Sequence, residues 1–221
     1  IARGLGARIL QHDYQNSAAQ KNWALPQTAH RWVLIVDADE RVTPSLKEEI
    51  QALLADAPRH AGYFVYRRNH FLGKPIRYCG WQRDRVLRLF DRDRVRYEER
   101  EVHARVLAEG PTPSLRSPLL HYTFRSFSQY WRKMERYSDW GAHELRSQGR
   151  RATVRHVFLH PVVRFLKTYV LQQGFRDGMH GLVLCMLTAF TVFLKYAKLW
   201  ELQLTQEAEG SPSQPPPLPP G

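Results

Sequence analysis

Several features that would indicate a particular class of protein are scarce in this sequence of 221 residues. It has two cysteines, Cys79 and Cys185, which lie far apart and show no metal-ligand spacing. Neither a disulfide framework nor a zinc site is therefore indicated, and we expect a reducing compartment. The first residues lack the pattern of a secretory signal peptide. The longest apolar run, residues 181–194, is shorter than the ~18 residues of a membrane-spanning helix, so it predicts a buried or interfacial helix.

Acidic residues are also rare in one late part of the chain. The formal net charge is +12, and residues 116–176 hold twelve Lys or Arg against three acids, a net of +9. That segment is expected to contact something anionic, and nucleic acid is one alternative. Its cations, however, are interleaved with long apolar stretches such as residues 157–170. This pattern favours attachment to an anionic membrane surface and not to nucleic acid.

The stretch from residue 31 to residue 46 is the most informative part of the sequence. Residues 32–36 are bulky and apolar, which predicts a fully buried strand, and Asp37, Asp39 and Glu40 follow it. At the carboxyl end of a strand in an open parallel sheet, ligands bind, and a period of two places Asp37 and Asp39 on the same side. Two hard oxygen ligands suit Mg²⁺ or Mn²⁺, which can hold a diphosphate. Glu40 is interpreted as structural.

An alternative for this stretch is a polar strand end before a helix that is capped by Thr43 and has Pro44 at its first position. Apolar spacing predicts that this helix runs to residue 56. A long helix with an aromatic stripe is predicted over residues 126–146, and its stripe is typical of a core. Residues 156–200 predict helical segments that are broken at Pro161 and at the glycines at 174, 178 and 181. Strands are predicted at 62–68 and 85–90.

Several short segments, in this order, resemble the family 2 inverting glycosyltransferases, in particular the bacterial branch that adds a sugar to the lipopolysaccharide inner core. The matching segments are residues 21–22, 32–40, 68–74, 80–81, 88–90, 102–103, 121–122, 174–178 and 195–199. The resemblance implies an α/β fold with a Rossmann-like GT-A domain over residues 1–122, incomplete at its amino terminus. A helical, membrane-associating extension would occupy residues 123–204, and a disordered Pro-rich tail residues 205–221.

The resemblance also implies a nucleotide-diphosphate sugar donor and a divalent metal, Mg²⁺ or Mn²⁺. Asp37 and Asp39 would contact the donor ribose and the metal-bound diphosphate, with Asp39 the direct metal ligand. Lys21 would contact phosphate or nucleotide, and Arg88 would neutralise the donor phosphates. Trp81 would be a platform for a sugar face. The alternatives are a solvated surface lysine for Lys21 and a partly buried core tryptophan for Trp81.

Inversion at the anomeric carbon needs a base that deprotonates the acceptor hydroxyl while the metal absorbs charge on the leaving diphosphate. The family pattern places carboxylates near a Val-His pair. Glu99 is the first choice for the base, because a carboxylate commonly occurs four residues before that His, and Glu101 is the second. The sequence departs from the family pattern at Ala104, where relatives usually carry Glu. His103 would orient the acceptor or contact the diphosphate. The alternative for His103 is an ordinary hydrogen-bonded strand histidine.

The implied function is transfer of a sugar to a lipopolysaccharide-core or similar glycolipid by a cytoplasmic enzyme that is peripheral on the inner membrane. The donor sugar stays open between glucose and heptose. The family's first strand, helix and second strand, which hold the nucleotide base, do not precede Ile1. We therefore expect a fragment that is inactive as given. The alternative function is an inactive truncated homologue that acts as a basic membrane-surface binding module.

Overall fold

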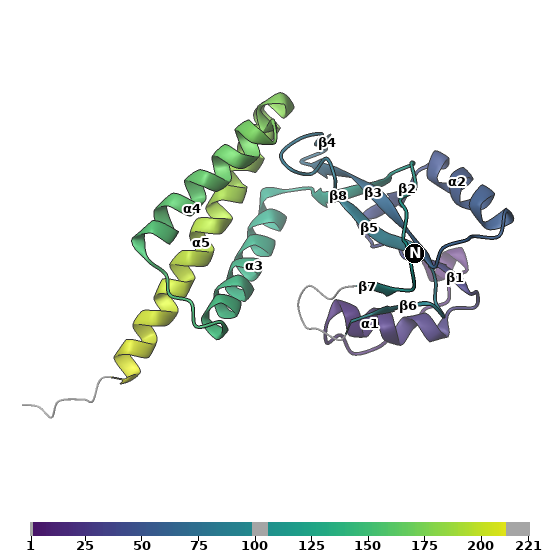
Figure 1. Cartoon of the computed structure of the whole chain (residues 1–221), viewed down its shortest axis with the longest axis horizontal. Helices are drawn as coiled ribbons and strands as arrows, with labels where there is room; N and C mark the ends of the chain where they lie inside the picture. Colours follow the sequence, from purple (N-terminus) through teal and green to yellow (C-terminus); the bar gives the residue numbers. More distant parts are fainter. Residues whose placement is uncertain (1, 99–105, 211–221) are drawn as a thin grey trace, which may run out of the picture. The chain divides into compact units, whose positions relative to one another are not determined.

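The computed structural model describes residues 2–98 and 106–210, with side chains as far as Thr205 (Figure 1). Its contacts divide the chain into two compact units. Unit 1 is formed by Ile1–Asn69 and Arg83–Tyr122, and unit 2 by His70–Gln82 and Thr123–Gly221. One division falls between residues 122 and 123, and the short segment 70–82 belongs with the later helices. The fold is mixed α/β, with the strands concentrated in unit 1 and the long helices in unit 2.

Unit 1 is built on antiparallel strand pairs. The strand order is β1-β5-β3-β8-β2, with β4 (Lys74–Pro75) paired to β3 and a separate β6-β7 pair. β1 pairs antiparallel with β5, β5 with β3, and β2 with β8. The sequence analysis assumed a parallel sheet for the strand that precedes the acids. This assumption is wrong for the pairing of β1 with β5, which is antiparallel. The elements are η1 (Arg3–Leu5), α1 (Ser17–Ala24), η2 (Leu25–Gln27), β1 (Trp32–Leu34), β2 (Glu40–Val42), α2 (Pro44–Ala55), β3 (Gly62–Phe71), β5 (Arg85–Asp91), β6 (Val95–Tyr97), β7 (Val106–Ala108) and β8 (Leu119–Phe124).

The strand before the acids is shorter and less buried than predicted. β1 spans three residues, each of them half-buried, and Val36 beyond it is 41% exposed. In the strand order β1 stands at one end and has β5 as its described neighbour. An end strand has one unpaired edge, which explains why this apolar run is not fully covered.

Helix α2 begins and ends close to its predicted limits. The Thr43 hydroxyl accepts a hydrogen bond from the backbone N–H of Leu46, and Pro44 is the first helical residue. Leu46 and Ile50 are buried in a cluster with Tyr63, Val65 and other residues of the sheet. The capped-helix interpretation of this stretch is confirmed, and it holds together with the acidic turn because α2 starts only after β2.

Unit 2 consists of helices around a short hairpin segment. Helix α3 closely matches its prediction and is capped by the Ser126 side chain. Its aromatic stripe is divided: Tyr130 and Met134 are buried, whereas Trp131 and Tyr137 are more than two-fifths exposed. The expected all-core stripe is wrong for these exposed side chains, because the buried face is a narrow row of residues spaced four apart. The elements are β4 (Lys74–Pro75), α3 (Phe127–Ser147), α4 (Val154–Leu166), the π-helical η3 (Lys167–Leu171), η4 (Gly174–Asp177) and α5 (Gly178–Gly210).

Two predicted helix breaks are absent from the described helices. α4 runs through Pro161, and α5 runs through Gly181. A Cβ at Gly181 would meet the Gly174 carbonyl oxygen at 1.9 Å, so glycine here allows close backbone packing and does not end the helix. The breaks predicted at the glycines at 174 and 178 coincide with η4 and the start of α5.

Helix α5 is longer than its apolar run suggested. In the part of the chain with described placement, one helical stretch, Gly174–Thr205, is long and apolar enough to cross a membrane, with a mean hydropathy of 1.7 over its best 18 residues. About a fifth of that window is buried. The expectation that this segment falls short of a spanning length is therefore wrong, because residues on both sides of the run continue the helix.

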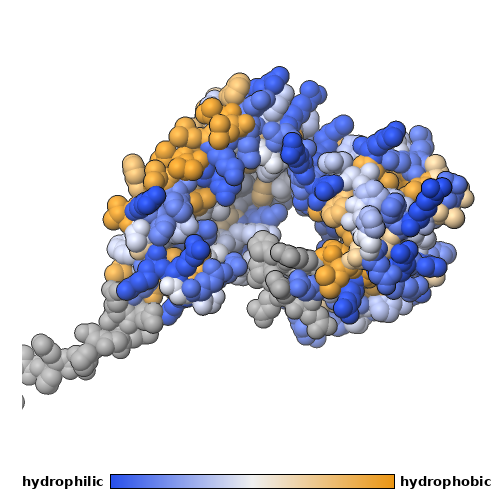
Figure 2. Space-filling model, viewed as in Figure 1, coloured by the Kyte–Doolittle hydropathy of each residue, from blue (hydrophilic) through white to orange (hydrophobic). Residues whose placement is uncertain are grey.

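Unit 2 also exposes many apolar side chains. Apolar residues gather over the region of α4 (Figure 2). Phe158 is 73% exposed and Leu171 is 77% exposed, and Val154, Val163 and Met179 are each more than half exposed. Single exposed apolar residues are normal on a protein surface, and unit 2 exposes several of them on neighbouring helical turns.

Candidate functional site

The acids after β1 lie in a tight turn and not in an extended strand. The Glu40 backbone N–H donates to the Asp37 carbonyl at 2.9 Å, and the Glu40 carboxylate accepts from the Asp37 backbone N–H at 3.0 Å. The Glu40 side chain is fully buried, whereas the Asp37 and Asp39 side chains are 45% and 44% exposed. Glu40 thus closes the turn, and the other two carboxylates are presented to solvent.

Arg88 of β5 joins two of these carboxylates. Its guanidinium contacts Asp37, and it lies 2.5 Å from a carboxylate oxygen of Glu40. The Arg88 side chain is only 4% exposed, and its buried Nε has no hydrogen-bond partner among the described residues. Burial raises the pKa of Asp37, but the charge and hydrogen bond of Arg88 outweigh it and leave that pKa below its usual value. Asp37 is therefore anionic at neutral pH.

A chain of polar contacts continues from Glu40 through β3. Arg67 lies 3.8 Å from the Glu40 carboxylate and donates two hydrogen bonds to Asp84, at 2.8 and 3.0 Å. Asn69 donates from its side-chain amide to the same Asp84 carboxylate at 2.6 Å. A guanidinium that donates two hydrogen bonds to one carboxylate has a fixed orientation, so Asp84 holds Arg67 in place and also orients the Asn69 amide.

The chain of contacts ends on Asp39 through His121 of β8. His121 Nδ1 lies 2.6 Å from the side-chain oxygen of Asn69, and His121 Nε2 lies 3.4 Å from the Asp39 carboxylate. Because the Asn69 amide nitrogen donates to Asp84, its oxygen accepts, and Nδ1 carries the hydrogen. The Tyr122 backbone N–H also donates to the Asp39 carbonyl at 2.8 Å. Asp37 and Asp39 are thus connected through one continuous set of buried and half-buried polar groups.

Lys21 of α1 belongs to the same neighbourhood. Burial lowers its pKa, and the nearby Asp37 carboxylate partly offsets this effect. Its ammonium group lies 5.2 Å from the centre of the Tyr97 ring, a cation–π contact. Burial raises the pKa of Tyr97 to about 12. The interpretation of Lys21 as a freely solvated lysine does not fit this half-buried position.

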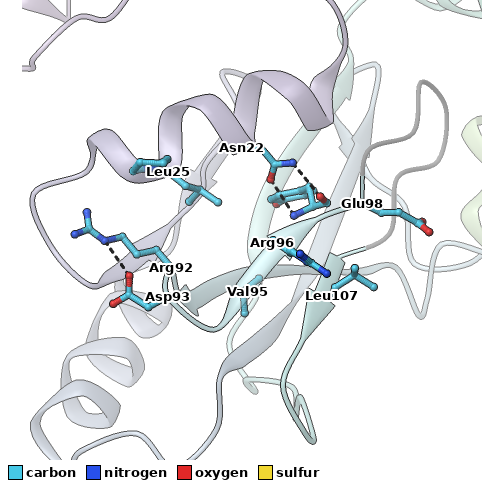
Figure 3. Close-up of a pocket in the computed structure, with 10 residues that line it drawn as sticks. Asn22, Leu25, Arg92, Asp93, Val95, Arg96, Glu98 and Leu107 are labelled. Atoms are coloured by element: carbon cyan, nitrogen blue, oxygen red, sulfur yellow. Dashed lines mark hydrogen bonds and ion pairs between the residues drawn. The ribbon is translucent and has the colours of Figure 1, made fainter.

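A cavity of about 760 Å³ lies next to these residues in unit 1 (Figure 3). Asn22 of α1 is hydrogen-bonded to Tyr97 of β6 on the other side of this cavity. The Asn22 side chain donates to the Tyr97 carbonyl at 2.9 Å and accepts from the Tyr97 N–H at 3.0 Å. The volume lies within the range of small-molecule sites, about 300–1,000 Å³. Asp37, Asp39 and Arg88 are not among its lining residues. Those residues are Asn22, Leu25, Pro26, Arg92, Asp93, Val95, Arg96, Tyr97, Glu98 and Leu107.

The structure brings some of the predicted site residues together but not all. Lys21, Asp37 and Arg88 interact electrostatically, and Asp39 is tied to the same network. Trp81 belongs to unit 2, where it packs against a hydrophobic core. The residues assigned as base or acceptor contacts, Glu99, Glu101 and His103, lie outside the described residues.

Sequence reasoning gave no role to several members of the network. Arg67, Asn69, Asp84 and His121 are separated along the chain and come together only through the pairing of β3, β5 and β8. The segments 68–74 and 121–122 were recognised as part of a resemblance, yet no local pattern in them indicates that Asn69 contacts His121.

Two residues of the network, Asp37 and Asp39, could supply carboxylate oxygens to a divalent cation. Within residues 2–98 and 106–210, no cluster of three or more His, Cys, Asp or Glu is arranged to hold a metal ion. Proteins commonly bind Mg²⁺ or Mn²⁺ through one or two carboxylates when substrate phosphates supply other ligands. One Asp37 oxygen is in close contact with Arg88, whereas the contact of the Asp39 carboxylate with His121 is longer, at 3.4 Å. Asp39 therefore has the more available carboxylate.

Comparison with known proteins gives relatives of one kind. The chain is 29% identical over 203 residues to the lipopolysaccharide core biosynthesis glycosyltransferase LpsC of Rhizobium meliloti, which covers 91% of this chain and 75% of the relative. It is 27% identical to an uncharacterized glycosyltransferase of Rickettsia typhi over 92% of this chain and 74% of the relative. A Rickettsia prowazekii protein of the same description is 26% identical over 94% of this chain and 75% of the relative. No family model matches the chain.

Proposed function

We propose that this chain is an inverting, metal-dependent glycosyltransferase of family 2 with a GT-A type, Rossmann-like domain. It would move a sugar from a nucleotide-diphosphate donor to a lipopolysaccharide-core or similar glycolipid. The observation that carries this proposal is the network that holds the carboxylates of Asp37 and Asp39 at the surface of unit 1. The relatives named glycosyltransferases over most of the chain support it.

In this proposal Asp39 and Asp37 hold Mg²⁺ or Mn²⁺ at the donor diphosphate. The metal would stabilise the negative charge that develops on the diphosphate as it leaves. Arg88 keeps Asp37 ionised and in place, and His121 and the Tyr122 N–H fix the position of Asp39. Lys21, half-buried next to Asp37, supplies a further cation on the donor side.

Glu99, with Glu101 as second choice, is proposed as the base that takes the proton from the acceptor hydroxyl, and His103 as a residue that orients the acceptor. All three follow Glu98, which lines the 760 Å³ cavity. A carboxylate can serve as a general base when it lies within hydrogen-bond reach of the hydroxyl proton. Trp81 keeps its proposed role as a sugar platform, with core packing as the alternative.

Unit 2 supports a location at a membrane. Exposed apolar side chains of α4, η3 and α5 are interspersed with Arg and Lys, a pattern that suits the surface of an anionic membrane. We propose that the protein is cytoplasmic and peripheral on the inner membrane. Because α5 is long and apolar enough to span, extraction of membranes with alkaline carbonate tests this: a peripheral protein is released and a spanning one is retained.

The same surface favours a second candidate function, a basic membrane-surface binding module without catalysis. The two functions differ in what Asp39 does. With any upstream coding sequence restored, sugar release from nucleotide-diphosphate sugars is measured with Mn²⁺, with EDTA, and with lipopolysaccharide-core acceptor. The transferase predicts activity that EDTA abolishes and that Asp39→Ala reduces to background.

The matched control is Asp56→Asn, which changes an exposed carboxylate at the end of α2. This variant is expected to keep full activity. Activity that is unchanged in Asp39→Ala would remove the metal role and leave the binding module as the better description.

A further inference from the structure

Unit 2 contains a second cavity, of about 360 Å³, which has only Trp81 in common with the proposed site residues. It lies among α3, α4 and α5, with Trp81 from the short segment at one wall. Its lining is mostly apolar or aromatic, with a few hydroxyl groups and three cations. The lining residues are Trp81, Phe124, Tyr130, Lys133, Met134, Tyr137, Ser138, Arg164, Leu184, Thr188, Thr191, Val192 and Lys195.

The charges at this cavity are all of one sign. Lys133, Arg164 and Lys195 line it, and no acidic residue is among its lining residues. In the described part of the chain, neither Arg164 nor Lys195 has an ion-pair partner. A site with three cations and apolar walls is complementary to a molecule that is anionic at one end and apolar at the other.

Lys195 is built into the wall of the cavity and does not extend freely into solvent. Its side chain passes over Gly141, where a Cβ would lie 2.7 Å from Lys195 Cδ. Its ammonium group is 4.8 Å from the centre of the Tyr196 ring. Burial lowers the pKa of Lys195, and the charge of Arg164 lowers it further, with a smaller opposing effect from Glu144. A bound anion would relieve the repulsion between these two cations.

Lys133 adds a third cation with a fixed position. Its ammonium group lies 5.0 Å from the centre of the Phe124 ring and 5.9 Å from that of Tyr137. Both rings also line the cavity. The α5 side of the cavity is formed by Leu184, Val192, Thr188 and Thr191. The hydroxyls of the two threonines donate to backbone carbonyls of the same helix. The single O–H donor of each is thus already used, and their methyl groups can contact an apolar chain.

We propose that this cavity binds an acyl chain of a phosphorylated lipid, with the lipid phosphate held by Lys133, Arg164 and Lys195. The exposed apolar side chains of α4 and α5 belong to the same unit, so a lipid would reach the cavity from the bilayer to which that surface attaches. As a site for the acceptor glycolipid, the cavity rests on the proposed transferase function. As a site for an anionic lipid, it stands on the geometry alone.

The test is a calorimetric titration of the full chain with decyl phosphate below its micelle concentration, without sugar donor. Saturable binding to one site is expected, and decanol and inorganic phosphate should each bind at least about tenfold more weakly, since each lacks one of the two recognised groups. Lys195→Met keeps the aliphatic stem and removes the charge, and it should weaken decyl phosphate binding by about tenfold or more. Lys195→Arg should restore binding.

The matched control is Arg132→Met, which removes an exposed cation from α3 that does not line the cavity. Thr188→Leu fills the cavity without changing its charge. This variant should weaken the binding of decyl phosphate and leave the weak binding of inorganic phosphate unchanged. Circular dichroism identifies any variant that fails to fold. Equal affinities of wild type, Lys195→Met and Arg132→Met, or inorganic phosphate binding as tightly as decyl phosphate, would overturn the proposal.

The two proposals fail separately. A chain that transfers no sugar but binds decyl phosphate as described loses the transferase function and keeps the lipid site. A chain that transfers sugar without binding decyl phosphate loses the lipid site alone.

Discussion

The two units of this protein use charge in opposite ways. In unit 1 the cations Arg67 and Arg88 are paired with Glu40, Asp84 and Asp37 inside a network of short contacts. In unit 2 the cations Arg164 and Lys195 face a cavity without acids in its lining. Paired charges hold one another in place, whereas unpaired cations attract an anion from outside.

The units differ in their apolar residues as well. Unit 1 packs two clusters of large apolar residues against its sheet, although it also exposes some, such as Leu5 and Val36. Unit 2 has its own core but leaves side chains such as Phe158 and Leu171 largely exposed. Unit 1 thus holds a few polar groups in fixed positions, whereas unit 2 exposes apolar side chains together with unpaired cations, the features on which the proposed attachment to an anionic membrane surface rests.

The largest expected effect in this comparison is the loss of Arg88. Arg88→Met leaves the fully buried Glu40 carboxylate without its closest cation. Removal of one partner from a buried ion pair costs about 3–5 kcal/mol, because an uncompensated charge stays buried. Urea denaturation followed by circular dichroism measures the free energy of unfolding. Arg83→Met, at an exposed arginine of the same unit, should change it by less than about 0.5 kcal/mol.

If Arg88→Met is no less stable than Arg83→Met, the Arg88 pairs do not stabilise unit 1, and the contrast with unit 2 fails. The double variant Arg88→Met, Glu40→Gln sharpens the result. It removes the unpaired charge together with its partner, so it should recover part of the lost stability.

The second effect concerns the position of Asp39. His121→Phe keeps a ring of similar size and removes the contacts to Asn69 and Asp39. Loss of a residue that orients a metal ligand typically lowers metal affinity by about 10–100-fold. We expect the Mn²⁺ concentration for half-maximal transfer to rise by about that factor, with a smaller change in kcat at saturating metal. An unchanged Mn²⁺ dependence would show that His121 only packs in the sheet.

How much of this network the sequence predicts depends on how local the signal is. The ends of α2 and α3 follow from Thr43 and Ser126, because a capping side chain bonds the backbone two or three residues later. The contact of Asn69 with His121 depends on the alignment of strands that are 52 residues apart. No pattern within a short window carries that information.

Two other failures have a cause closer in the sequence. The alternation expected for Asp37 and Asp39 assumes an extended chain, but the Glu40 carboxylate closes a turn with the Asp37 N–H. The break expected at Gly181 assumes a glycine that disrupts a helix, but here the glycine allows the Gly174 carbonyl to approach. In both cases a specific contact that strand alternation or glycine propensity does not describe decided the conformation.

The third effect tests the exposed apolar surface of unit 2. Phe158→Ser removes a side chain that is 73% exposed, so it should leave the free energy of unfolding nearly unchanged. If that side chain enters a bilayer, its full burial contributes roughly 1.5–3 kcal/mol. Binding to vesicles with anionic lipid, measured by co-sedimentation, should therefore weaken by about tenfold. The control in unit 1 is Leu5→Ser, at an 82% exposed leucine, which should bind as wild type does.

The smallest effect is an acid dependence that belongs to unit 1. Asp91 is 2% exposed in its side chain and accepts from Arg31 at 2.6 and 2.8 Å. Burial raises its pKa, but the hydrogen bonds from Arg31 and the Asp93 N–H outweigh this and lower it overall. A carboxyl whose folded pKa lies below its unfolded value of about 3.9 stabilises the fold above that pH and loses this contribution as pH falls through the folded pKa. The difference in unfolding free energy between wild type and Asp91→Asn should thus be largest at pH 7 and shrink below a pH of about 4.

The control is Asp139→Asn in unit 2, where the carboxylate is 49% exposed and pairs with Lys198. This variant should lose little free energy of unfolding at pH 7, because exposed ion pairs contribute little to stability. If the difference in unfolding free energy between wild type and Asp91→Asn is the same at pH 7 and pH 2.5, the hydrogen bonds of Asp91, and not its charge, stabilise β5. The paired charges of unit 1 would then differ less from those of unit 2 than their geometry indicates.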